Sequence, residues 1–312
     1  MAAEEANRPA GERASSSTGQ QWLPRIALTV GDPAGIGPEI AAKAAQDPSV
    51  RAVCDPITFD TPAHADVRPG QVSAAAGRAA YQTIVRAVEA ARRGEVDAIA
   101  TAPVNKLAFA QAGLHWKGHT DLLAHLCGDA RVAMMFHSPE LKVVLLTVHV
   151  PLREVPSLLT PELVDETIAL TVDAMRSFGV TSPRLAVAGL NPHAGESGVI
   201  GTEDDAVLAP AVERARQRGI AMTGPVPGDT VFVRARHGEF DCVIACYHDQ
   251  GLIPIKLLAF GHAVNVTIGL PIIRTSVDHG TAFDIAGQGK ADSGSMIAAV
   301  TLAAQMASMR RR

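Results

Sequence analysis

Short apolar runs alternate with longer helix-forming stretches along this chain of 312 residues, and this alternation limits its possible folds more than any other feature. The apolar runs that read as buried strands are 26–30, 97–101, 185–190 and 243–246. The stretches that read as helices are 73–94, 162–178, 203–218 and 293–309. Strands that alternate with helices form a largely parallel sheet covered on both faces. The sequence therefore predicts an α/β protein.

Local signals refine this prediction. Residues 138–140 (Ser-Pro-Glu) separate two apolar runs, 132–136 and 141–148, and so predict a hairpin with some antiparallel pairing. Ser73 is expected to cap its helix, and Pro38 to occupy the first position of a helix after a glycine-rich turn. Residues 1–21 have almost no apolar content, which predicts a disordered leader.

Composition narrows the functional classes. With 47% hydrophobic and 19% charged residues, the chain can bury a large core and is expected to divide into two lobes. A net charge of -4 and 4% aromatic residues disfavour a broad nucleic-acid surface. No apolar run is long enough to span a bilayer, and the first residues lack the pattern of a secretory signal. Four cysteines without CxxC spacing fit buried, reduced thiols in a cytoplasmic protein.

Three histidines, His149, His193 and His248, each follow an apolar strand-like run within a polar motif. Polar side chains at the carboxyl ends of strands converge on one crevice in an α/β sheet. Three imidazoles are enough protein ligands for a catalytic divalent metal with an open position. Any one of these histidines alone is as easily explained by a hydrogen bond within a loop. The same context occurring three times favours a metal site.

The densest polar stretch runs from residue 248 to 279 and includes Lys256, Asn265 and Arg274 among apolar residues that read as strands. Two cations, an amide and hydroxyl groups suit a doubly charged phosphate monoester. The alternative for the two cations is a solvated surface or a structural ion pair. His119 and Thr120 open a predicted helix and can contact a polar ligand, although Thr120 could also be an ordinary helix cap.

The remaining motifs leave several interpretations open. Asp229 could orient a ligating histidine, bind substrate or cap the next helix. The glycine loop at residues 31–37 follows a strand and precedes a helix, the setting that holds anions on backbone N–H groups. Its spacing is neither that of a dinucleotide fingerprint nor that of a phosphate-binding loop, so a structural turn explains it equally well. No cofactor-binding residues can be assigned.

Six short segments follow one another along the chain: GDPAGIGPE at 31–39, TAPVNK at 101–106, GHT at 118–120, NPHAGE at 191–196, YHDQG at 247–251 and IRTSVDHGT at 273–281. In this order they resemble the motifs of the 4-hydroxythreonine-4-phosphate dehydrogenase family, which acts in pyridoxal 5′-phosphate biosynthesis. The resemblance covers the chain from about residue 26 to its end. Two departures from the family pattern are a short passage at residues 54–69 and His262-Ala263 where many members have Arg-Gly.

The resemblance implies a fold similar to the isocitrate and isopropylmalate dehydrogenases, with two α/β/α lobes, mostly parallel sheets and a central cleft. The expected lobes are residues 22–130 with 268–312, and residues 131–267, the second carrying the histidines. It also implies a homodimer with the metal site at the subunit interface, and no nucleic-acid or membrane partner.

Residue by residue, the resemblance implies that His149, His193 and His248 bind the metal, one of them from the other subunit. It implies that the substrate is contacted by His119, Thr120, Lys256, Asn265 and Arg274, and that Asp229 and Lys256 are catalytic. Zinc is the expected metal, although three imidazoles also accept cobalt, nickel, manganese or, less readily, magnesium. The general base stays open between Asp229, a lysine and a metal-bound water.

The implied reaction is a metal-assisted oxidation of 4-phosphooxy-L-threonine by NAD or NADP. Its product is a 2-amino-3-oxo acid that loses carbon dioxide to give 3-amino-2-oxopropyl phosphate. Two alternatives remain. One is a sister dehydrogenase of the same fold that acts on threonate or erythronate 4-phosphate or on a dihydrodiol acid. The other is a non-redox protein that binds metal or phosphate.

Overall fold

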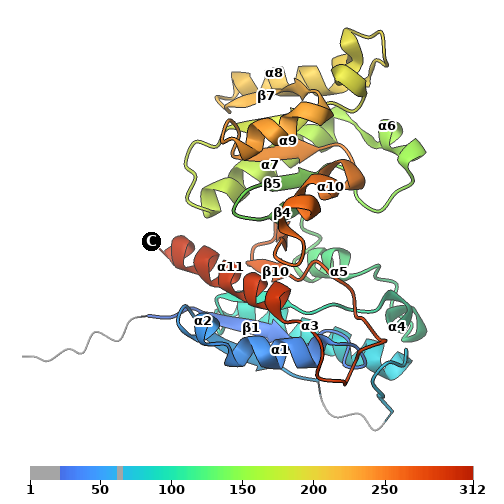
Figure 1. Cartoon of the computed structure of the whole chain (residues 1–312), viewed down its shortest axis with the longest axis vertical. Helices are drawn as coiled ribbons and strands as arrows, with labels where there is room; N and C mark the ends of the chain where they lie inside the picture. The colour runs from blue at the N-terminus through green and yellow to red at the C-terminus, as the bar shows by residue number, and fades with distance from the viewer. Residues whose placement is uncertain (1–21, 62–65, 312) are drawn as a thin grey trace, which may run out of the picture.

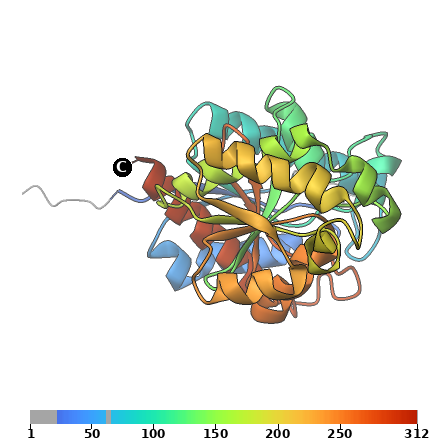
Figure 2. The same cartoon turned by 90° about the horizontal axis from the view of Figure 1, so that it is seen from above.

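The computed structural model of the protein describes residues 22–61 and 66–311, so the predicted leader at 1–21 lies outside the described residues. Figure 1 shows two halves stacked along the longest axis, with the first described strand and the last helix in the lower half and the middle of the chain in the upper half. Figure 2, seen from above, shows helices on both faces of the central sheet. The predicted α/β class is confirmed.

A single sheet of ten strands runs through both halves in the order β2-β1-β3-β10-β9-β4-β5-β8-β6-β7. Six of its nine strand pairings are parallel, and the three antiparallel ones all involve β4 or β9 at the middle of the sheet. The strands are β1 Arg25–Thr29, β2 Asp55–Phe59, β3 Ala98–Thr101, β4 Ala133–His137, β5 Lys142–Leu145, β6 Leu185–Ala188, β7 Met222–Val226, β8 Cys242–Ala245, β9 Val264–Ile268 and β10 Arg274–Ser276.

Helices follow most strands, as the alternation predicts. The α-helices are α1 Gly37–Gln46, α2 Pro48–Arg51, α3 Ala74–Arg92, α4 Lys106–Gln111, α5 His119–Leu126, α6 Val155–Leu158, α7 Pro161–Ser177, α8 Ala209–Gln217, α9 Gly228–Arg236, α10 His248–Ala259 and α11 Gly294–Arg311. The 3-10 turns are η1 Leu152–Glu154 and η2 Pro192–Glu196, and η3 Asp204–Leu208 is π-helical. None of the helices in the described ranges could cross a membrane.

Several local predictions are confirmed. Ser73 Oγ accepts the Ala76 N–H at 3.1 Å and caps α3. A proline stands in the first turn of α1. The hairpin around residues 138–140 pairs β4 with β5 in antiparallel fashion. The short passage at residues 54–69, a departure from the family pattern, supplies an edge strand, β2, which pairs in parallel with β1.

One local prediction is wrong, and two alternatives that the sequence left open are excluded. Residues 248–259 form helix α10 instead of strand-like segments, because Leu252, Ile255 and Ala259 recur at helical spacing and are buried together. Thr120 does not cap α5, whose N-cap is Gly118. Asp229 does not cap α9, which begins after Pro227.

The core follows the alternation of side chains along each strand. One continuous apolar cluster lies on one face of the sheet and joins the two halves, packing β1 and β6 against α1, α7, α8 and α11. On the opposite face, α3, α4 and α5 cover the first half. Helices α9 and α10 cover the second half on that face. Because the sheet is covered on both faces, the carboxyl ends of its strands are left to form a binding site.

Candidate active site

A cavity of about 550 Å³ opens where the two halves meet. Its walls come from α5, β4, β5, β9, β10 and the segments that follow β3 and β5. Five residues predicted to contact substrate or metal line this cavity: His119, Thr120, His149, Asn265 and Arg274. The volume and the few converging polar groups are typical of a small-molecule site.

Arg274 on β10 is the most deeply buried charge in the cavity, with 2% of its surface exposed. Its Nη1 donates to Thr267 Oγ1 at 2.8 Å and its Nη2 donates to Thr101 Oγ1 at 2.7 Å. Neither partner is charged, and Nε has no hydrogen-bond partner among the residues that the structure describes. Burial lowers the pKa of Arg274 to about 9, so the side chain is a cation at neutral pH. A buried cation without a carboxylate is costly, and an anionic ligand would compensate it.

His119 begins α5 and is 9% exposed. Burial, and then the charge of Arg274, hold its pKa well below the ordinary value. The imidazole is therefore neutral at physiological pH, and its Nε2 is free to exchange a hydrogen bond with a ligand. Asn265 Oδ1, across the cavity on β9, is likewise buried without a partner. These polar atoms without partners mark the cavity as built for a polar ligand.

Two of the three predicted metal ligands lie together. The rings of His149 and His248 have centroids 5.6 Å apart and line a second hollow of about 260 Å³, so His149 borders both spaces. His248 Nδ1 lies 2.7 Å from Asp249 Oδ1, a contact that fixes the ring and leaves Nε2 as the nitrogen that could bind a ligand. Burial, then the charges of Lys106 and His248, lower the pKa of His149.

His193 does not join this pair: within residues 22–61 and 66–311, no three metal-binding side chains are close enough to hold an ion. It is an exposed residue at the start of a left-handed turn, in which His193, Ala194, Glu196 and Ser197 all have positive φ. Buried Asp204 anchors this turn, accepting the N–H groups of Leu190 at 2.8 Å and Asn191 at 3.0 Å. One chain thus brings two of the three predicted metal ligands together, His149 and His248, and leaves His193 apart from them.

Two predicted catalytic residues lie outside the cavity. Lys256 is a half-buried residue in the last turn of α10, and Asp229 is exposed in the first turn of α9. Neither lines the cavity of this chain. The prediction that Lys256 lies among strand ends is wrong because the segment is helical.

The glycine loop between β1 and α1 is a structural turn. Gly31 has φ +64, and a Cβ there would lie 2.2 Å from the carbonyl oxygen of Pro103. The loop uses its N–H groups internally: Asp32 donates to Pro103, Gly35 to Asp32 and Ile36 to Thr281. Little is left to hold an anion, so the structural interpretation fits better.

Lys106, Lys117 and His279 also line the cavity but were not among the predicted site residues. Lys106 ends the TAPVNK motif, and its position just after a predicted strand is the sequence signal that could have identified it as a site residue.

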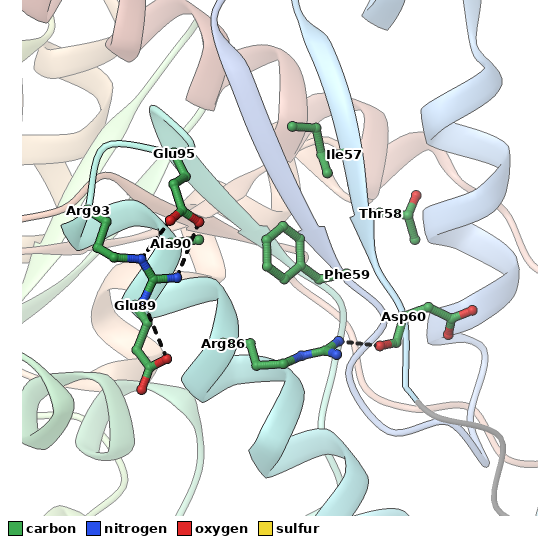
Figure 3. Close-up of a pocket in the computed structure, with 9 residues that line it drawn as sticks. All are labelled: Ile57, Thr58, Phe59, Asp60, Arg86, Glu89, Ala90, Arg93 and Glu95. Carbon is green, nitrogen blue, oxygen red and sulfur yellow. Dashed lines mark hydrogen bonds and ion pairs between the residues drawn. The ribbon is translucent and has the colours of Figure 1, made fainter.

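A separate open hollow between β2 and α3 has a different character (Figure 3). Its arginines already have partners within the protein: Arg93 pairs with Glu95 at 2.7 Å, and Arg86 donates to the backbone carbonyl of Asp60 at 2.5 Å.

The chain was compared with known proteins. The family model described as pyridoxal phosphate biosynthetic protein PdxA matches residues 27–303. A 4-hydroxythreonine-4-phosphate dehydrogenase from Desulforapulum autotrophicum is 44% identical, covering 92% of this chain and 96% of its own. A D-threonate 4-phosphate dehydrogenase from Cupriavidus necator is 40% identical, covering 93% and 99%.

Solved structures agree. A 4-hydroxythreonine-4-phosphate dehydrogenase from Klebsiella pneumoniae has a TM-score of 0.83 at 42% identity, covering 91% of this chain and 98% of its own. A terephthalate 1,2-cis-dihydrodiol dehydrogenase from Burkholderia xenovorans has a TM-score of 0.67 at 32% identity, with the same coverage of both chains. An isocitrate dehydrogenase from Methylococcus capsulatus shares the fold, with a TM-score of 0.51 at 15% identity, covering 90% of this chain and 88% of its own. The chain belongs to the pyridoxal phosphate biosynthetic protein PdxA family.

Proposed function

We propose that the protein is an NAD(P)-dependent dehydrogenase that oxidises 4-phosphooxy-L-threonine at C3. The 2-amino-3-oxo acid so formed loses carbon dioxide to give 3-amino-2-oxopropyl phosphate, in pyridoxal 5′-phosphate biosynthesis. One observation carries the proposal: in a chain of this family, a buried arginine without a carboxylate lies in the same cavity as His119, Thr120 and Asn265.

The phosphate is assigned to Arg274. A dianionic phosphate compensates the buried guanidinium, whose Nε still lacks a partner. Thr101 and Thr267 hold the other two nitrogens in place from β3 and β9, so the cation does not have to reorganise when substrate arrives. Neutral His119 and Asn265 add hydrogen bonds without adding charge. Bound in this way, the phosphate fixes C3 of the substrate at a set distance from the cavity floor.

The reacting end of the substrate lies toward His149 and His248. These imidazoles are assigned to a divalent metal, with zinc first and cobalt, nickel, manganese or magnesium as alternatives. When bound, such an ion supplies Lewis acidity at the C3 oxygen, both for loss of hydride to NAD(P)+ and for the decarboxylation that follows. Asp249 orients His248 through their 2.7 Å contact.

A homodimer completes this site. His193, Lys256 and Asp229 lie outside the cavity of their own chain. Exposed apolar side chains mark one face of α10, the helix that carries Lys256: Ile253 is 65% exposed, Leu257 84%, and Phe260 just beyond the helix 78%. Burial of such a stripe favours association. Pairing through α10 would bring Lys256, to which a catalytic role is assigned, to a partner's cavity. The second catalytic role is assigned to Asp229, at the start of α9.

A second candidate function is oxidation of D-threonate 4-phosphate. The 40% identity to an enzyme of that name is close to the 44% identity to the 4-hydroxythreonine-4-phosphate relative. Both substrates carry a phosphate and a carboxylate, so the same cavity accommodates either. We further propose that residues 22–130 with 268–312 form one lobe, that 131–267 form the other, and that the protein is cytoplasmic.

Turnover with a panel of substrates tests the proposal. The metal-loaded protein is assayed with 4-phosphooxy-L-threonine, D-threonate 4-phosphate, D-erythronate 4-phosphate and a dihydrodiol acid, each with NAD+ and NADP+. The highest kcat/KM is expected for 4-phosphooxy-L-threonine. Preference for another phosphorylated acid would select the sister activity, and no reduction of either nicotinamide would refute a dehydrogenase.

A further inference from the structure

Lys106 is a charged cavity residue that the proposed mechanism leaves without a role. It stands five residues after Thr101, the last residue of β3, and lines the cavity together with His149. No acidic residue stands in the first turn of α4, where Lys106 begins the helix. In the part of the chain that the structure describes, its ammonium group forms neither an ion pair nor a hydrogen bond. A cation at the positive end of a helix is electrostatically unfavourable, which gives it no stabilising role in α4.

Three cations, Arg274, Lys106 and Lys117, line the cavity, and two of them lie near different predicted ligand-binding histidines. Arg274 lies deep, bonded to Thr101 and Thr267, and its charge acts on His119. Lys106 is exposed at the rim, and its charge acts on His149. The two cations therefore neighbour different histidines, one at the phosphate end and the other at the metal end.

The proposed substrate has a matching arrangement of charge. It is a four-carbon acid with its phosphate on C4 and its carboxylate on C1, so the two anionic groups stand at opposite ends with the reacting C3 between them. A phosphate held at Arg274 leaves the carboxylate pointing toward the rim near His149. An ammonium group at that rim meets it with a charge-assisted hydrogen bond.

We infer that Lys106 binds the substrate carboxylate and, with Arg274, selects phosphorylated hydroxy acids by the spacing of their two anionic groups. This inference rests on the proposed function, since it takes the ligand to be such an acid. It assigns Lys106 a role in binding and orientation and leaves the proton transfers to other groups.

Binding to probes with and without a carboxylate tests the inference. Zinc-loaded wild type, Lys106→Met and Lys106→Arg are titrated by calorimetry with 4-phosphooxy-L-threonine, with D-threonate 4-phosphate and with 3-hydroxypropyl phosphate, which lacks the carboxylate. Lys106→Met is expected to bind both acids about 10- to 100-fold more weakly and 3-hydroxypropyl phosphate as tightly as wild type. Lys106→Arg should recover most of the loss, and Lys290→Met, at an exposed lysine outside the cavity, should match wild type.

Two results would overturn the inference. Equal weakening of all three probes, or of none, would show that Lys106 does not read the carboxylate. A rise in the KM for NAD(P)+ on Lys106→Met, with substrate affinity unchanged, would place Lys106 at the cofactor. Because these titrations need no turnover, a wild type that binds the acids without oxidising them would contradict the proposed function and leave the inference standing.

Discussion

Arg274 Nη2 donates a 2.7 Å hydrogen bond to Thr101 Oγ1, joining two residues that are 173 positions apart in the chain. The bond crosses from β10 to β3, which pair in parallel. It places a cation on the floor of the cavity between the halves. Because the partner is a neutral hydroxyl, the charge of Arg274 is held in position but not neutralised.

Replacing Arg274 with Met should therefore separate ligand binding from stability. Removing a buried, uncompensated cation is expected to leave the free energy of unfolding unchanged or to raise it. The KM for the phosphorylated substrate should rise about 100-fold, because a charge-assisted contact is lost. Thermal melts with and without inorganic phosphate measure both effects. Stabilisation of the variant by phosphate equal to that of wild type would remove Arg274 from the phosphate site.

The histidines predict a complementation experiment. If His149 and His193 bind one metal from different protomers, His149→Ala and His193→Ala should each lose bound metal and activity while keeping their fold. A mixed dimer of the two variants has one site with both mutations and one with neither. Dissociating and reassociating the variants in equal amounts should thus restore about one quarter of wild-type activity. If all three ligands came from one chain, the mixture would stay inactive.

Asp204 is expected to hold the His193 turn. Its buried carboxylate accepts two backbone N–H groups and Asn191 Nδ2 at 2.9 Å. Asp204→Ala leaves the two backbone N–H groups without this acceptor, whereas Asn191 Nδ2 keeps Glu203 Oε2 at 2.9 Å. The variant should lose about 2–4 kcal/mol of unfolding free energy. Hydrogen exchange at residues 190–200 should accelerate. Asp205→Ala, at the exposed neighbouring carboxylate, is the matched control and should leave both measurements near wild type.

His137 predicts sensitivity to acid. Burial, then the charge of Lys142, lower its pKa to about 4. The folded state therefore favours the neutral imidazole, while the unfolded chain takes up a proton near its ordinary pKa of 6.5. The contribution of neutral His137 to the free energy of unfolding is fully present above pH 6.5. It is lost as the pH decreases toward 4, by up to about 3 kcal/mol.

Urea unfolding between pH 7 and 4 measures this effect. His137→Leu should flatten that part of the stability profile, whereas His237→Leu, at an exposed histidine, should not. A profile for His137→Leu parallel to that of wild type would show that other groups cause the loss in acid.

The apolar face of α10 predicts the oligomeric state. Leu257 is 84% exposed in the single chain, and Leu257→Asp places a charge in the centre of the stripe formed with Ile253 and Phe260. The variant should sediment as a monomer and lose activity, because a shared site cannot form. Val233→Asp changes an exposed apolar residue on α9 and serves as a control. An unaltered dimer of Leu257→Asp would exclude α10 as the interface.

The sequence by itself determined the α/β class, the hairpin between β4 and β5, the cap at Ser73 and the family, because each depends on local periodicity or on a short motif. It also pointed to His119, Thr120, Asn265 and Arg274, since strand ends and helix starts converge in such a sheet.

Tertiary structure alone decided the rest. The burial of Arg274 among neutral partners depends on strands distant in sequence. The separation of His193 from His149 and His248 depends on a left-handed turn that Asp204 anchors, and no periodicity signals it. The sequence placed Lys256 among strand-like residues because a segment that contains Gly251 and Pro254 is locally typical of irregular or extended structure. Its apolar residues nevertheless pack on the sheet at helical spacing, and that long-range burial made it a helix.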